Sequence, residues 1–448
     1  MASRVKKSPL FIIFLVVFID LVGFGIVIPI LPYYAKAYGA SATMLGWLMT
    51  SYSLMQFFFA PVWGRLSDRI GRRPVLLGSM AGIGLSMVML GLAPSLLWLF
   101  IGRTLAGICG ANISTATAYI ADITSEEDRA KGMGIIGAAF GLGFIFGPVI
   151  GGLLSRFGFG VPMFAAAVLA LGNIIFAYFK LPEPPRTREF REATRVKRFD
   201  IAAVRDTMGD SRTRMAVVLL FIATVALTQM EVTLALFMQA RHGFDAQGTG
   251  WLLAFMGLIM VVVQGGLIGR LSKRFGEPRL ILVGTIAMAI ALVLMAQAAG
   301  IPWLVVGIAL LALGNGITNP SLSSLASKGA LPERQGATMG VYQSAGSLAR
   351  VVGPPMAGML YDGFGIARPF IVAAGLMAFA FWSVAMWQIG ASSRLKEAVT
   401  VLRTSGMKGL VKAYGWRVVA GVVAYYLIRD ITLYILLPWL VAEGILSL

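Results

Sequence analysis

The sequence lacks the residues that build disulfide frameworks, metal centres and most catalytic sites. Its 448 residues include one cysteine and one histidine, and only 13% are charged. A lone cysteine excludes a disulfide framework, and Cys109 lies in an apolar stretch where packing is its expected role. His242 falls in an expected outer loop, where we expect it to be solvated. No glycine-rich phosphate loop, metal cluster or nucleophile–base pair stands out, so the sequence predicts no enzyme, no cofactor and no metal site.

Acidic residues are also scarce, and the charge balance is strongly basic. Lys and Arg number 38 against 20 Asp and Glu, which gives a net charge of +18. Such a balance is typical of nucleic-acid binding only when basic residues share a soluble face with aromatics, and the sequence has no such domain. With 58% hydrophobic residues and a mean hydropathy of +0.82, the chain holds more apolar sequence than a soluble protein can bury. We therefore predict an all-α membrane protein that contacts the lipid bilayer and no nucleic acid.

Apolar stretches of roughly 20 residues, long enough to cross a bilayer as helices, recur along the chain. The first expected span carries Asp20 and is too long for the core of a signal peptide, so we expect it to stay in the mature protein. We predict twelve spans at 9–33, 43–63, 75–93, 98–122, 132–155, 160–180, 214–238, 248–269, 280–298, 303–326, 336–360 and 369–389, and a thirteenth at 417–446.

Basic residues are distributed unevenly between the two sides that these spans define. If the N-terminus is cytoplasmic, the outer loops hold only Lys36, Arg156, Arg241 and Arg368, and the inner segments hold nearly all the others. By the positive-inside rule, this distribution predicts a multi-pass cell-membrane protein with a cytoplasmic N-terminus. The positive charge is thus mostly a topology signal.

Two segments return in the second part of the chain, which indicates a duplication. Residues 64–78, a short charged loop with apolar residues after it, recur in weakened form as 269–283, and the glycine-rich segment 134–152 aligns without gaps on 340–358. Such repeats are typical of transporters made of two parallel halves. We predict an N-terminal six-helix half at 1–180, a cytoplasmic linker at 181–213 that begins Leu-Pro-Glu-Pro-Pro, and a C-terminal six-helix half at 214–390.

The tail, 391–448, is expected to add an amphipathic segment and the additional transmembrane helix. Residues 394–416 have the basic amphipathic pattern of a helix that lies on a membrane surface. At the centre of the thirteenth span, Arg429 and Asp430 point in different directions on a helix, so each needs a partner elsewhere. We favour packing of this helix beside the transporter or a second subunit over a place on the substrate path.

Four motifs in order along the chain resemble the major facilitator superfamily. They are residues 20–32 of the first span, the loop at 64–73, Arg103-Thr-Leu-Ala-Gly107 with 118–124 in the fourth span, and Gly-Pro-x-x-Gly-Gly at 147–152 in the fifth. Within it, the chain is similar to twelve-helix drug:proton antiporters, especially bacterial tetracycline efflux proteins. The resemblance implies a major facilitator fold, alternating access, and proton-coupled efflux of small lipophilic drugs across a bacterial inner membrane, with a small-molecule substrate and protons as partners.

Two positions depart from the tetracycline exporters. Those proteins carry a histidine in helix eight and an aspartate in helix nine, where this chain has Met260 and Met288. Tetracycline is therefore one candidate among lipophilic drugs. An importer or a lysolipid or lipid transporter of the same fold is an alternative that has less reason for the glycine-rich pattern. A non-transporting sensor or scaffold is a second alternative, and it would not require Asp20.

Three charged residues inside apolar spans are candidates for proton coupling. Asp20 lies near the middle of the first span, where a carboxylate is costly and protonation removes the cost; permanent pairing with a structural cation is the alternative. Arg103 needs an anion unless it extends to the outer interface, and the resemblance implies that it assists proton transfer. Glu231, nearer the outer face, could bind a cationic drug or a second proton, or could simply line the pore.

Charges and glycines at the inner ends of the second to fifth spans predict a conformational latch, because opposite charges there can form a network that breaks in one state. The alternative is that they only set the orientation. Lys273 replaces Asp68 in the second copy, so we expect an asymmetric latch. The latch residues are Gly64, Asp68, Arg69, Gly71, Arg72, Arg73, Asp122 and Arg129, with Asp128 nearby.

Two further sets complete the candidate site. The glycines of the fifth span allow a neighbouring helix to approach closely, and its proline allows a bend; the set is Gly143, Gly147, Pro148, Gly151 and Gly152. Polar residues within spans are candidates for the substrate pocket, although each could equally bond one helix to another. They are Gln56, Asn112, Gln229, Gln264, Asn315, Gln343 and Arg350, the last also a partner for the carboxylates or for an anionic substrate group.

Overall fold

The computed structural model describes residues 9–110, 112–124, 129–184, 205, 207–298, 300–330 and 335–391. Residues up to Trp382 belong to one compact unit, and the second unit begins at Ser383. The predicted thirteenth helix, the amphipathic segment, most of the linker and Asp128 lie outside the described residues. The side chains of Asn112 and Arg129 also lie outside them.

Each of the twelve predicted spans coincides with a helix or a pair of helices. The N-terminal half contains α1 (Pro9–Ala37), α2 (Ala42–Ile70), α3 (Arg72–Gly91), α4 (Leu96–Cys109), α5 (Asn112–Ile123), α6 (Arg129–Leu154) and α7 (Gly160–Lys180). The C-terminal half contains α10 (Ser211–His242), α11 (Ala246–Val262), α12 (Ile268–Phe275), α13 (Glu277–Gln297), α14 (Ile301–Gly329), α15 (Gln335–Phe364) and α16 (Arg368–Ala391). Within the described ranges, nine helices are long and apolar enough to cross a membrane. The prediction of an all-α membrane fold is thus confirmed.

The fourth predicted span is not one helix, which corrects the expectation for 98–122. The helix α4 ends at Cys109, and α5 begins at Asn112. Two side chains from α2 accompany the break: Gln56 Nε2 donates to Gly110 O at 2.9 Å, and Trp63 Nε1 donates to Ile108 O at 2.5 Å. These bonds satisfy carbonyls at a helix end that would otherwise lack partners in the apolar interior.

The eighth predicted span is also irregular. Between α11 and α12 the helix widens into one π-helical turn, Val263–Leu267, which contains Gln264 and two glycines. Such turns are frequent at functional positions.

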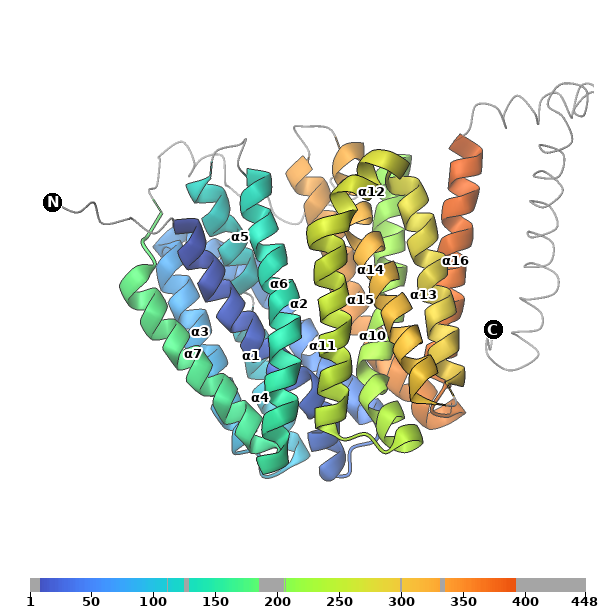
Figure 1. Cartoon of the computed structure of the whole chain (residues 1–448). Coiled ribbons are helices and arrows are strands. Elements are labelled where there is room, and N and C mark those ends of the chain that lie inside the picture. Colours follow the sequence, from blue (N-terminus) through green and yellow to red (C-terminus); the bar gives the residue numbers. More distant parts are fainter. Residues whose placement is uncertain are drawn as a thin grey trace, which may run out of the picture. The chain divides into compact units, whose positions relative to one another are not determined.

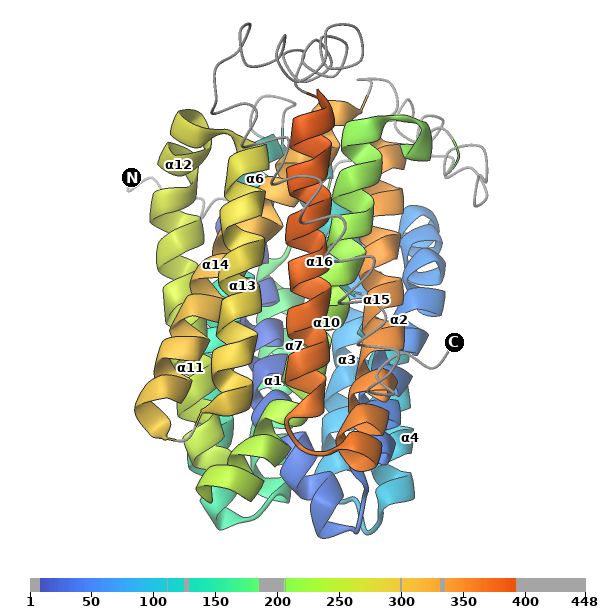
Figure 2. The same cartoon turned by 90° about the vertical axis from the view of Figure 1, so that its right-hand side faces the viewer.

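The two ends of the helices differ in how the halves meet. We call the end with residues 64–72 and 269–277 the Arg72 end, and the end with residues 38–42 and 243–246 the Ala42 end. In Figure 1 the Arg72 end, with α12, is at the top. The halves meet where α6 packs against α11 and α2 against α15 (Figures 1 and 2). At the Ala42 end one apolar cluster joins Ile30 and Leu45 of the first half to Val232 and Ala357 of the second.

Candidate functional site

The Tyr52 side chain of α2 contacts side chains from two other helices between the helices of the N-terminal half. The Arg103 guanidinium from α4 lies over the Tyr52 ring, 4.4 Å from its centroid, a cation–π contact. The Phe24 ring from α1 lies 5.5 Å away on a centroid-to-centroid measure. Phe24 is one helical turn after Asp20, so the two residues share the face of α1 that is turned toward Tyr52.

Charges from both halves act on this group. The Tyr52 hydroxyl lies within electrostatic reach of Asp20, Arg103 and Arg350, and Arg350 in turn acts on Glu231. Arg350 reaches the group because its neighbour in α15 is bonded to α2, where Thr50 Oγ1 donates to the Val351 carbonyl at 2.9 Å. We call Asp20, Tyr52, Arg103, Glu231 and Arg350 the central cluster.

The members of the central cluster differ in exposure. Arg103 is 4% exposed, so it does not extend to the outer interface, and its Nε has no hydrogen-bond partner among the described residues. Glu231 and Arg350 are exposed. Met230 and Val232, which flank Glu231 in α10, are 1% and 2% exposed, so Glu231 lies on a different face of α10 from its two buried neighbours.

The chemistry of the central cluster is that of a proton-sensitive charge balance. Two carboxylates and two guanidinium groups give no net charge when all are ionised, and one proton on either carboxylate leaves one positive charge. In an interior of low dielectric constant such a change has a large effect on any charged or polar ligand. No group of three or more His, Cys, Asp or Glu side chains that could hold a metal ion occurs in the part of the chain that the structure describes.

The remaining polar candidates are more dispersed. Gln229 is fully buried, and neither end of its amide has a hydrogen-bond partner among the described residues. The Asn315 amide lies 3.8 Å from Met260 Sδ, and Gln264 lies in the π-helical turn. Gln343 is exposed. The sequence analysis missed Tyr52; its only signal is an aromatic ring one turn before Gln56 in a polar-containing span.

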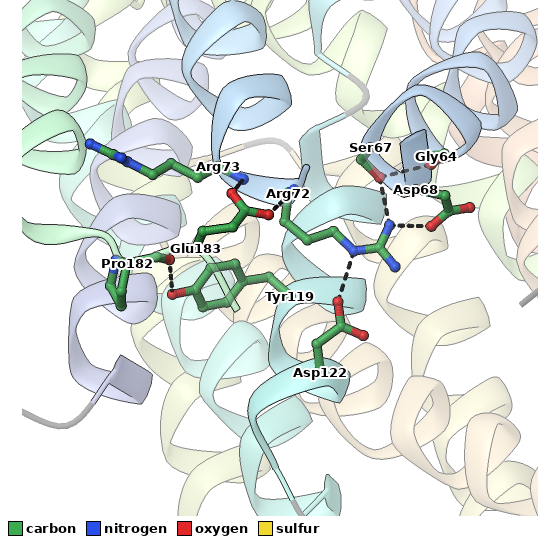
Figure 3. A network of polar contacts seen from close by, with 9 residues as sticks. All are labelled: Gly64, Ser67, Asp68, Arg72, Arg73, Tyr119, Asp122, Pro182 and Glu183. Atoms are coloured by element: carbon green, nitrogen blue, oxygen red, sulfur yellow. Dashed lines mark hydrogen bonds and ion pairs between the residues drawn. The ribbon is translucent and has the colours of Figure 1, made fainter. Parts of the chain in front are cut away.

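Three of the predicted latch residues meet in one network at the Arg72 end (Figure 3). Arg72, the first residue of α3, donates from Nη1 to Asp68 Oδ1 at 2.5 Å and from Nε to Asp122 Oδ2 at 2.9 Å. Its Nη1 also donates to Ser67 Oγ at 2.6 Å. Arg72 is 8% exposed. One buried guanidinium therefore ties the end of α2 to the end of α5 within the N-terminal half.

Glu183 completes this network and was not predicted as a site residue. Its carboxylate accepts from the backbone N–H groups of Arg72 at 2.8 Å and Arg73 at 2.9 Å. A helix that begins with two arginines places positive charge at the positive end of its own dipole, and a carboxylate there offsets it. The signal was an acid directly after the sixth span, in a segment interpreted only as linker.

Arg73 and Gly71 have separate roles. The Arg73 guanidinium lies over the Tyr178 ring at 5.4 Å and donates to the Tyr178 carbonyl, so it is turned toward α7 and away from Asp68 (Figure 3). Gly71 has φ of 121°, a region that side chains other than glycine rarely adopt, and this allows the tight turn from α2 to α3.

Hydrogen bonds join the halves at the Ala42 end. Asp362 of α15 accepts from the backbone N–H groups of Ala42 at 3.2 Å and Thr43 at 2.8 Å, the first residues of α2. The Tyr33 hydroxyl lies 2.7 Å from Thr249 Oγ1. In addition, Lys36 Nζ donates to Gln239 Oε1 at 2.9 Å. This end of the protein is closed by polar contacts between the halves.

The glycines of α6 allow close contacts with one helix of the same half and with one helix of the other half. A side chain on Gly147 would place its Cβ 2.5 Å from the Gly25 Cα in α1, and one on Gly152 would place its Cβ 3.0 Å from the Gln247 Cα in α11. Gly147 therefore allows two helices of one half to touch, whereas Gly152 allows contact between the halves.

We expect Asp362→Asn to weaken closure of the Ala42 end, because an amide lacks the charge that interacts with the start of α2. A loss of about 1 kcal/mol would shift the equilibrium roughly fivefold. A cysteine at Ala40 in a Cys109→Ser background should then react faster with a membrane-impermeant maleimide. Asp245→Asn is the control, since Asp245 Oδ1 caps α11 within its own half, accepting from Gly248 N at 2.8 Å. Equal rates in both variants would contradict the assignment.

Comparison with known proteins agrees with this architecture. The family profile described as "Major Facilitator Superfamily" matches residues 13–349 and 266–447. The tetracycline resistance protein, class B, of Escherichia coli is 34% identical over 348 residues, 77% of this chain and 86% of that protein. Multidrug resistance protein 2 of Bacillus subtilis is 28% identical over 386 residues, 86% of this chain and 96% of that protein.

A solved structure is also similar. The crystal structure of the human organic anion transporter MFSD10 has a TM-score of 0.64 and 26% sequence identity. The match covers 85% of this chain and 100% of that one.

Proposed function

The chain belongs to the major facilitator superfamily and is a multi-pass membrane transporter of small molecules, and from that premise we propose that it exports small lipophilic molecules in exchange for protons by alternating access. The observation that carries the proposal is the central cluster, in which Asp20 and Arg103 of one half and Arg350 of the other all act on Tyr52, and Arg350 also acts on Glu231. Tetracycline and multidrug resistance proteins among the relatives support export of drug-like substrates.

The cycle that we propose uses the two ends in turn. By the positive-inside rule the Arg72 end is cytoplasmic, as is the N-terminus, in a bacterial inner membrane. The closed Ala42 end then belongs to a state that takes up substrate from the cytoplasm. Asp20 releases its proton to the cytoplasm and the substrate binds; opening of the Ala42 end releases the substrate and lets Asp20 take up a proton from outside. Arg103 adjusts the charge near Asp20, and Glu231 is the second titratable group.

The division into parts that we propose follows the same scheme. Residues 1–180 and 214–390 form the two six-helix halves, 181–213 the cytoplasmic linker, and 391–448 the segment with the additional transmembrane helix, which contacts the transporter or another subunit. The latch residues at the Arg72 end join the ends of α2, α3 and α5 in a network that forms in one state of the cycle and breaks in the other. The polar residues Gln56, Gln229 and Gln343, with those named above, contribute to the substrate pocket.

A second candidate substrate class is organic anions. Two guanidinium groups in the central cluster, one of them buried with an unsatisfied Nε, suit a carboxylate or another anionic group. The similar structure is that of an organic anion transporter. The same fold could also import its substrate or carry lysolipids.

Transport in proteoliposomes separates these possibilities. The purified protein is reconstituted, a pH gradient is imposed, and uptake is measured for matched sets of lipophilic cations, neutral phenicols, tetracyclines, organic anions and lysolipids. We expect at least one lipophilic drug to accumulate on the acidic side and to leak out when the gradient is collapsed. Accumulation that is insensitive to both pH gradient and membrane potential would overturn proton-coupled export.

A further inference from the structure

A buried carboxylate at the Arg72 end of the C-terminal half is held by three side chains. Glu277, the first residue of α13, is 8% exposed. Its Oε1 accepts from Lys328 Nζ at 2.5 Å, from Ser272 Oγ at 3.0 Å and from Ser324 Oγ at 3.0 Å. These bonds tie the start of α13 to α12 on one side and to the end of α14 on the other.

The repeat places Glu277 at the position of Arg72. When residues 64–78 are aligned on 269–283, Arg72 falls on Glu277 and Ser67 falls on Ser272. The second repeat, 134–152 on 340–358, continued backwards without a gap, places Asp122 on Lys328. Both partners of the Arg72–Asp122 ion pair thus have counterparts that also form an ion pair, with the two charges exchanged.

A serine and a glycine that recur in both halves explain how an arginine in one half and a glutamate in the other can occupy equivalent positions. A serine hydroxyl can donate or accept: Ser67 Oγ accepts from the Arg72 guanidinium, whereas Ser272 Oγ donates to the Glu277 carboxylate. In both halves a glycine with positive φ precedes the central residue, Gly71 at 121° and Gly276 at 75°. Both turns therefore use a glycine with positive φ, and the central charge that follows it has the opposite sign.

The helix dipole explains why, among the described residues, an additional acid binds the start of α3. Glu277 is itself a carboxylate at the start of a helix, where negative charge is favourable. Arg72 is unfavourable at the equivalent place, and Glu183 from the end of α7 binds the first N–H groups of α3. Glu183 thus compensates for the exchanged charge of its own half.

We propose that Glu277 and Lys328 form the latch of the C-terminal half, the charge-exchanged counterpart of Arg72 and Asp122. What the duplication retains is the bond between the turn and the helix end, not the residue types. Each pair lies within its own half, so each keeps the turn at the Arg72 end fixed to that half while the halves move against each other. This proposal needs the chain to be a transporter and does not depend on proton coupling.

Charge exchange between Glu277 and Lys328 tests the proposal. Lys328→Gln should lower substrate exchange at equal pH about tenfold, because it leaves the Glu277 carboxylate, whose side chain is 11% exposed, without its cation. Glu277→Gln should lower exchange less, because the Lys328 side chain that it leaves is 61% exposed. The double variant Glu277→Lys with Lys328→Glu should recover to within about threefold of the wild type, short of full recovery because a cation then begins α13. Asp210→Asn is the control, since Asp210 caps α10 at the same end within its own helix.

The distance between the halves distinguishes a latch from a merely stabilising pair. Spin labels on cysteines at Arg65 and Arg270, in a Cys109→Ser background, report that distance at the Arg72 end. We expect the single variants to change its distribution and the double variant to restore it. A double variant no better than the singles, or unchanged distances in all of them, would overturn the proposal. Exchange at equal pH needs no proton coupling, so failure of coupling alone would overturn only the proposed function.

Discussion

Asp20→Asn is expected to abolish pH-driven accumulation of substrate while leaving the folded protein and its exchange at equal pH intact. Asparagine keeps the shape of aspartate and cannot take up or release a proton. For one proton per substrate, a gradient of one pH unit supplies about 1.4 kcal/mol, or roughly tenfold accumulation. In the variant the ratio of inner to outer substrate should fall to one. The measurement is the accumulation ratio in proteoliposomes at imposed gradients of zero and one unit.

Glu231→Gln is the matched control for that variant. Glu231 also belongs to the central cluster, but it is exposed and lies nearer the Ala42 end. We expect it to change the apparent affinity for substrate and to keep the response to the gradient. If Asp20→Asn accumulates substrate fully and Glu231→Gln does not, the coupling role belongs to Glu231.

Arg72→Gln is expected to have the second largest effect. It removes the cation between Asp68 and Asp122, whose side chains are 28% and 16% exposed, and leaves two carboxylates close together. Breaking a fully buried pair costs about 3–5 kcal/mol; discounted for this exposure, we expect about 2 kcal/mol, a roughly thirtyfold change in the populations of two states. Transport should fall, and a cysteine at Arg69 should become more reactive from the Arg72 side.

Arg65→Gln is the control for this result. Arg65 is exposed, and its Nε donates to the Pro61 carbonyl of its own helix at 3.1 Å. Asp68→Asn should give an intermediate effect, because Asp122 still holds Arg72. If Arg72→Gln and Arg65→Gln behaved alike in both transport and reactivity, the network would be a topology signal without a role in the cycle.

The fold could be predicted from the sequence because its strongest signals are local. Apolar length located helices in all twelve predicted ranges, nine of which are long and apolar enough to cross a membrane among the described residues. The break after Cys109 could not be predicted in this way, since the bonds that accompany it come from Gln56 and Trp63 of another helix. The hydropathy of the segment Arg103-Thr-Leu-Ala-Gly107 and its flanks predicts one continuous apolar span.

The candidate site likewise contains some residues that the sequence predicted and others that it did not. Asp20, Asp68 and Arg72 were named because a charge within or beside an apolar span stands out in the sequence. Tyr52, Glu183 and Glu277 were missed because an aromatic in a span, an acid in a linker and an acid in a loop are each ordinary by themselves. Only the packing of helices distant in sequence makes Tyr52 a contact of Arg103 and Glu183 a cap for α3.

Proton movement driven by substrate tests the central claim most directly. Proteoliposomes that contain the protein and a pH-sensitive dye are prepared at equal pH on both sides, and a substrate from the panel is added outside. Obligatory exchange predicts that protons leave as substrate enters, so the interior becomes alkaline, and that Asp20→Asn removes the signal. Substrate entry without any change of interior pH, or with acidification, would contradict the account.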